Sequence, residues 1–105
     1  MVAIELTIDG KKKKFEKKEL FMRENIEAMK FSFKQAEYLN KEEQTAEDIE
    51  ENQKHFADFI SFVFNRDFTA EEFINGCPVK SYPIAENIYI ECLGGKNDDE
   101  KKEKA

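Results

Sequence analysis

The sequence predicts a mainly helical α+β fold, in which an N-terminal β-hairpin is followed by two long antiparallel helices and two shorter helices in a single domain. Three observations predict it. Residues 2–8 alternate between apolar and polar side chains and end at an Asp-Gly pair. Two long segments, about 18–40 and 45–64, carry apolar residues at helical spacing. The chain has 105 residues, which is the length of one domain.

Composition narrows the classes of function. Hydrophobic residues make up 40% of the chain and charged residues 38%, so the core is small and the surface is strongly solvated. The net charge of −6 argues against a nucleic-acid partner, and no apolar run is long enough for a membrane span. The two cysteines lack CxxC spacing, which favours a reduced cytoplasmic setting. Ten phenylalanines are more than so small a core needs, which indicates a partner surface.

The hairpin is predicted from residues 2–8, an Asp-Gly turn and a return strand over 11–15. A two-residue turn places Glu5 opposite Lys14 on the solvent face, a favourable cross-strand pair. On the other face it pairs Ile8 with Lys11, Leu6 with Lys13 and Ile4 with Phe15. The lysine run 11–14 is therefore interpreted as a solvated strand in preference to a nucleic-acid patch, because no aromatic residues interleave it.

The first long helix, about 18–40, has apolar residues on two faces. One stripe contains Met22, Ile26, Met29, Phe33 and Ala36. Phe31 and Tyr38 lie on a different face, together with Leu20. Two interpretations carry equal weight: the helix is buried on both sides, or Phe31 and Tyr38 face outward toward a partner.

The second long helix, 45–64, is the element around which the chain is organised. Thr45 can cap its first turn, with Asp48 three residues later. Its apolar face contains Ile49, Phe56, Phe59, Ile60 and Val63, and Phe62 lies off that face. The short polar connection 40–44 makes the two long helices antiparallel neighbours. We expect their shared core to contain Met29, Phe33, Phe56, Phe59 and Val63.

Two short helices and a tail complete the chain. A capping box of Thr69 and Glu72 opens a helix over 69–75, which ends at Gly76. The last helix, 81–93, starts near a proline and ends at Gly-Gly, although 88–93 can also be interpreted as a strand. One of its faces contains Ile84, Ala85, Ile88 and Cys92, whereas Ile90 and Leu93 lie off that face. The globular domain is therefore 1–95, and the polar residues 96–105 are expected to be a disordered tail.

The sequence offers no catalytic motif, metal-ligand pattern or cofactor fingerprint. His55 is the one histidine and is interpreted as a boundary residue, because no second ligand or nucleophile accompanies it. The acidic pairs Glu42-Glu43, Glu50-Glu51 and Glu71-Glu72 are typical of solvated helix faces. The prediction is a protein that is not an enzyme and binds no cofactor or metal.

The order of these features resembles a known family. An apolar strand, a D-G turn and a basic return strand precede two long helices, and the second of these closes in Phe62, Phe64, Phe68 and Thr69. A short acidic helix then ends at a glycine, and the last helix ends in Leu-Gly-Gly. This layout, over residues 2–95, resembles the tail assembly chaperones of long-tailed bacteriophages, particularly those of Gram-positive hosts.

The resemblance implies a protein that acts in the host cytoplasm during virion assembly. It implies binding to the tape measure protein and help in bringing tail tube subunits to it, in some members through a longer form made by ribosomal frameshifting. Some members self-associate, so a homo-oligomer is a further expectation. A frameshift is expected near residues 94–98, where lysine and asparagine codons permit a run of adenines.

Two other classes of protein remain open: a small helical adaptor or antitoxin-like binding protein, and a minor structural subunit of the virion. Under each interpretation the partner is a protein, with no nucleic acid or membrane involved. Apolar residues off the main helical stripes are the candidate partner-binding residues. They are Phe31, Tyr38, Phe62 and Ile90.

Overall fold

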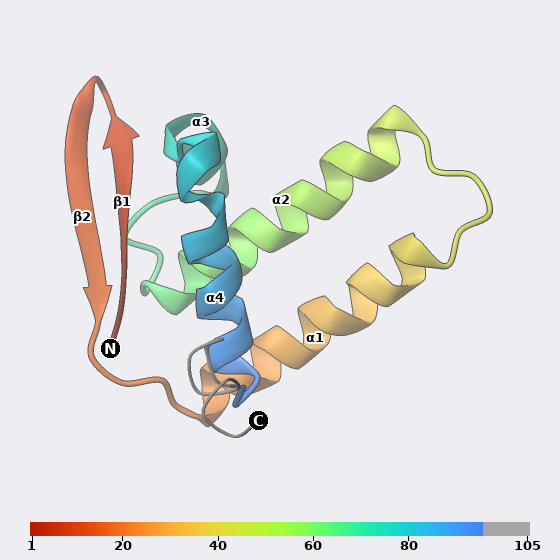
Figure 1. The fold of residues 1–105 in the computed structure, drawn as a ribbon, viewed down its shortest axis with the longest axis horizontal. Helices are drawn as coiled ribbons and strands as arrows, with labels where there is room; N and C mark the ends of the chain where they lie inside the picture. The colour runs from red at the N-terminus through yellow and green to blue at the C-terminus, as the bar shows by residue number, and fades with distance from the viewer. Residues whose placement is uncertain (96–105) are drawn as a thin grey trace.

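A computed structural model describes residues 1–95 of the chain, and the fold class predicted from the sequence is confirmed (Figure 1). The elements in order are β1 (Val2–Ile8), β2 (Lys11–Lys17), α1 (Met22–Leu39), α2 (Ala46–Val63), α3 (Ala70–Gly76), a 3-10 turn (Val79–Ser81) and α4 (Tyr82–Cys92). The alternative of a strand over 88–93 is wrong, because residues 88–92 continue α4 and Leu93 is its C-cap. The predicted tail, 96–105, lies outside the described residues.

The hairpin has the register expected from its turn. Ile4 lies opposite Phe15 and Glu5 lies opposite Lys14. Gly10 in the turn has φ +77°, a conformation that glycine adopts without steric cost. β2 is two residues longer than predicted, because Val2 has a partner in Lys17 at the far end of the ladder.

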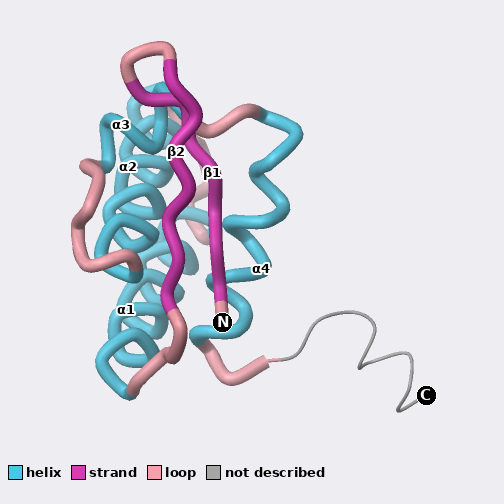
Figure 2. The backbone as a smooth tube through the Cα atoms, turned by 90° about the vertical axis from the view of Figure 1, so that its left-hand side faces the viewer, coloured by secondary structure: helices cyan, strands magenta, loops and turns pink. Residues whose placement is uncertain are grey.

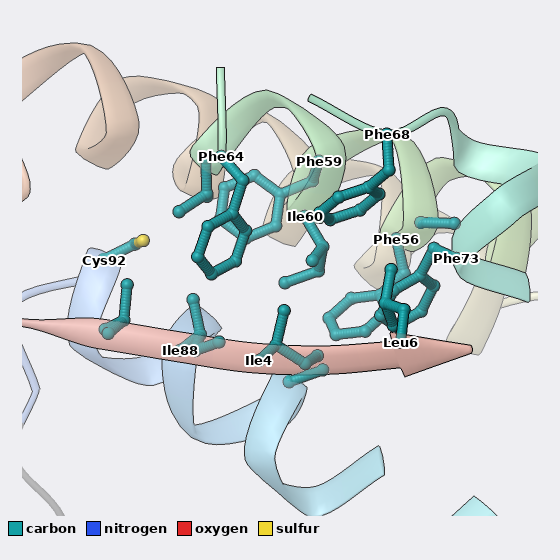
Figure 3. Close-up of a cluster of buried hydrophobic side chains, with 14 of the residues drawn as sticks. Ile4, Leu6, Phe56, Phe59, Ile60, Phe64, Phe68, Phe73, Ile88 and Cys92 are labelled. Carbon is teal, nitrogen blue, oxygen red and sulfur yellow. The ribbon is translucent and has the colours of Figure 1, made fainter. Parts of the chain in front are cut away.

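The hairpin and the four helices enclose one core. Figure 2 shows the two strands side by side in front of the helices, and β1 turns its apolar face inward, with every second residue from Val2 to Ile8 buried. Figure 3 shows Ile4 and Leu6 of β1 facing the aromatic side chains of α2 and α3, with Ile88 of α4 beside them. A lone ribbon would be marginal in water, so this helical layer is what stabilises it.

The segment between α2 and α3 completes the core. The rings of Phe64 and Phe68 have centroids 5.8 Å apart, and Phe68 also packs on Phe15 of β2 at 4.8 Å. Gly76 at the end of α3 lies so close to the backbone of Thr7 that a Cβ there would overlap the Thr7 carbonyl oxygen. Absence of a side chain at Gly76 therefore lets α3 cover the outer edge of β1.

The two long helices are antiparallel neighbours, as predicted, but α1 turns a different face to the core from the one expected. Met29 and Phe33, predicted to lie in the shared core, are exposed, whereas Ala28 and Phe31 are buried. Phe31 packs against Phe56 of α2 and Tyr89 of α4, so this face of α1 joins the aromatic part of the core.

Two further residues predicted on buried faces are exposed. Figure 1 shows α1 and α2 extending together beyond α3 and α4, toward the loop that joins them. Ile49, predicted on the buried face of α2, lies in this projecting part and is 54% exposed. Ile84 in the first turn of α4 is also exposed rather than buried. Periodicity identified the apolar faces, but no other element of the described residues 1–95 packs over Ile49 or Ile84 closely enough to bury it.

Candidate partner-binding surface

Helix α1 exposes a line of apolar side chains along the face turned away from the core. Phe33 is 75% exposed, Met22 is 70% exposed and Met29 is 50% exposed, while Ile26 between them is half-buried. The four positions step by four, three and four residues, so they form one line about 17 Å long on a single helix face. We call Met22, Ile26, Met29 and Phe33 the α1 stripe.

The opposite face of α1 holds the helix in this orientation. Phe31 is 4% exposed, and its ring centroid lies 5.4 Å from that of Phe56, 6.3 Å from that of Phe59 and 5.3 Å from that of Tyr89. Rotating α1 to bury the stripe would remove Phe31 from these three aromatic neighbours. The aromatic cluster therefore fixes the stripe at the surface.

The N-terminal end of α1 is tied to its surroundings by polar contacts. The buried carboxylate of Glu24 accepts a hydrogen bond of 2.6 Å from the backbone N–H of Phe21 and lies 3.7 Å from Nζ of Lys17. Asn25 donates a hydrogen bond of 2.9 Å to the carbonyl oxygen of Cys92 in α4. Because a buried carboxylate needs such partners, these contacts position the first turn of α1 against β2 and α4.

The loop end of the helix pair is polar. Nζ of Lys41 lies 2.7 Å from Oδ1 of Asp48, and this contact, with the Thr45 backbone N–H as a second donor, lowers the pKa of the Asp48 carboxyl. Thr45 and Asp48 form the predicted capping box. Between the helices lies a cleft of about 220 Å³ whose lining includes Tyr38 and His55 among charged side chains.

The four residues predicted to bind a partner lie on three helices and are not part of the α1 stripe. Of the two interpretations left open for Phe31, the structure supports burial over an outward orientation, because Phe31 is a core residue. Tyr38 is half-buried at the polar cleft, and Phe62 is half-buried with the guanidinium of Arg66 5.8 Å from its ring centroid. Ile90 is partly exposed on α4. The periodic pattern of the α1 stripe is visible in the sequence, but this face of the helix was predicted to lie in the core.

The thiols of the described residues are poor nucleophiles. Burial, with smaller contributions from the nearby carboxylates of Glu24 and Glu91, raises the pKa of the Cys92 thiol to about 12. Burial also raises the pKa of Cys77, so both thiols are protonated at neutral pH. Within residues 1–95, no group of three His, Cys, Asp or Glu side chains is placed to hold a metal ion. The exposed apolar residues of the α1 stripe suit the binding of a protein.

No helix among residues 1–95 is both long enough and apolar enough to cross a membrane.

Comparison with known proteins gives one result that covers the whole chain. The model of a family described as phage tail chaperone protein matches residues 1–105. Curated proteins and solved structures give no match. The hairpin, the two antiparallel long helices and the two shorter helices are the layout on which the resemblance to tail assembly chaperones rested. With a match over its full length, the chain belongs to the family of phage tail chaperone proteins.

Proposed function

We propose that this protein is a tail assembly chaperone that binds the tape measure protein in the host cytoplasm and assists assembly of the tail tube around it. The observation that carries the proposal is the α1 stripe, an apolar line on the surface of a small, strongly charged protein. Large exposed apolar residues in one line mark interaction sites more often than isolated ones do.

The spacing of the stripe suits a helical partner. Apolar residues that recur every three or four positions along one helix pack into the matching stripe of a second helix. A tape measure protein that is a long amphipathic helix would offer such a stripe along its length. Several chaperone molecules could then cover successive segments of one client and keep its apolar residues away from solvent.

The charge of the chain supports the same role. A net charge of −6 on 105 residues disfavours precipitation of a complex whose client would otherwise aggregate. We propose further that a longer form of the protein, made by a frameshift near residues 94–98, brings the tail tube protein to the complex. An overlapping downstream reading frame and a slippery adenine-rich sequence in the gene would support that longer form, and absence of both would count against it.

The test is co-expression with the tape measure protein. Wild-type chaperone should keep the client in the soluble fraction, and Met29→Ser/Phe33→Ser should lose this activity while its circular dichroism stays native. Leu39→Ser is the matched control, because Leu39 is exposed on α1 but lies off the stripe. A client that is equally soluble without any chaperone, or with the double variant, would contradict the proposal.

The protein content of virions and the stoichiometry of the complex distinguish a chaperone from the two other roles. A chaperone should be absent from purified virions, whereas a minor structural subunit would be present in them. A chaperone that coats a long client should bind it in several copies, whereas an adaptor would bind one folded partner in a fixed ratio. Mass spectrometry of virions and light scattering of the purified complex distinguish these outcomes.

A further inference from the structure

A second surface lies across α2 from the helix that carries the stripe. Figure 1 shows α1 on one side of α2 and α3 on the other. Between α2 and α3 there is a groove of about 1060 Å³. Two isoleucines line it, Ile49 from α2 and Ile74 from α3, which are 54% and 44% exposed. Ala46 and Ala70 add small apolar surfaces. We call this feature the α2–α3 groove.

The dimensions of the groove suit a helix. Along α2 its lining runs from Ala46 to Asp58, which is about 18 Å, or a little over three helical turns. Alanines at positions 46 and 70 leave room for a partner backbone to approach, and the two isoleucines offer apolar anchors. An amphipathic helix laid into a groove makes contacts of this kind, with one apolar side chain per turn.

The rim of the groove is acidic. Four carboxylates line it, those of Glu50, Glu51, Asp58 and Glu71, against a single lysine, Lys54. Two of the carboxylates are already paired, Glu50 with Lys54 at 3.3 Å and Asp58 with Arg66 at 2.9 Å. Glu51 and Glu71 make no ion pair with any other residue of the described part, 1–95. These carboxylates therefore favour a partner that brings positive charge beside its apolar stripe.

We propose that the α2–α3 groove binds an amphipathic helix of a partner protein, whose apolar stripe is bordered by lysine and arginine. The isoleucines supply the apolar contact, and the carboxylates set the orientation and select against acidic helices. This site is separate from the α1 stripe, so one chaperone can hold two helical segments, one on each side of α2. A merely solvated helix face would carry the carboxylates but would not need two exposed isoleucines in the same groove.

The test uses isotope-labelled protein and a synthetic peptide of about four helical turns, with a leucine stripe flanked by lysines. Amide shifts should map to Ile49 and Ile74 and their neighbours in the groove. Ile49→Ser/Ile74→Ser should weaken binding in the groove, followed by the groove amide shifts, at least tenfold, whereas Phe33→Ser on the α1 stripe should leave those groove shifts unchanged. All three positions are exposed, so circular dichroism should confirm that both variants are folded.

Two control peptides make the result specific. A peptide with glutamates in place of the lysines should bind at least tenfold more weakly, and raising the salt concentration should narrow that difference. A scrambled peptide of the same composition should not bind. Shifts confined to α1 with none in the groove, equal binding of all three peptides, or no binding of the lysine peptide at millimolar concentration would each overturn the proposal.

Sedimentation of the protein alone tests whether a second copy of the chain occupies the groove. If Ile49→Ser/Ile74→Ser converts a wild-type oligomer into a monomer, a second copy of the chain fills the groove and the proposal is wrong. If both proteins have the same mass across the concentration range, the groove is free for a separate partner, as we expect.

Discussion

Phe31 and Phe33 lie two residues apart on α1, and truncation to alanine should lower the unfolding free energy strongly at Phe31 and only slightly at Phe33. Phe31 is 4% exposed among three aromatic rings, whereas Phe33 is 75% exposed. A fully buried phenylalanine removes about 200 Å² from water, which at about 25 cal/mol per Å² amounts to about 5 kcal/mol. Alanine keeps the Cβ atom, which lowers this cost, whereas the cavity left by the ring raises it. Phe31→Ala should therefore lower the unfolding free energy by about 3–5 kcal/mol.

Phe33→Ala should cost less than about 0.5 kcal/mol, because folding buries little of the apolar surface of this exposed ring. The assay is urea unfolding of both variants followed by circular dichroism. In thermal unfolding, Phe31→Ala should lower Tm by at least about 12 °C, since each kcal/mol shifts the Tm of so small a domain by about 4–8 °C. Phe33→Ala should leave Tm almost unchanged.

The opposite result would refute the orientation of α1. A loss above about 2 kcal/mol for Phe33→Ala together with a loss below about 1 kcal/mol for Phe31→Ala would mean that the stripe is buried. The α1 stripe would then be a core feature and could not bind a partner. The pair of variants therefore tests the structural basis of the proposed function without needing the client.

Three further predictions concern packing, charge and thiol reactivity. Gly76→Ala should lower the unfolding free energy by about 1–3 kcal/mol, because its Cβ would overlap the carbonyl oxygen of Thr7, and an unchanged denaturation midpoint would show that α3 can shift freely. Carboxyl NMR shifts should show that Asp48 titrates below its usual pKa in the wild-type protein and closer to its usual pKa in Lys41→Ala. Because the pKa of Asp48 is lower in the folded than in the unfolded state, the stabilisation from Asp48 is present above the unfolded-state pKa and is lost as the pH falls through the folded-state pKa. Cys92 should resist a thiol reagent at pH 8 in the folded protein and react on unfolding, because burial raises its pKa to about 12, and rapid labelling of the native protein would contradict its buried position.

Local signals in the sequence were sufficient for most of the fold. The Asp-Gly turn and the alternation of residues 2–8 determined the hairpin register. The capping boxes at Thr45 and Thr69 located the starts of α2 and α3. Each of these signals depends on residues within a few positions of one another, so a single sequence contains the information they need.

The candidate site was harder to predict, because it depends on which of two apolar faces of α1 is buried. Periodicity detects both faces and favours the one with more large side chains, which led to the assignment of Met29 and Phe33 to the core. The choice is made instead by contacts over long sequence distances, in which Phe31 meets Tyr89 of α4 and Phe59 of α2. Equally, Ile49 belongs to the apolar face of α2 but lies beyond the reach of the covering layers.

Photo-crosslinking in the assembled complex tests the central claim most directly, which is that the α1 stripe contacts the tape measure protein. A photoreactive phenylalanine analogue would replace Phe33 in one sample and Glu5, exposed on the outer face of the hairpin, in the other. Irradiation of each complex with the client should give an adduct with the tape measure protein from position 33 and none from position 5. Crosslinks from position 5 alone, or equal yields from both positions, would contradict this account.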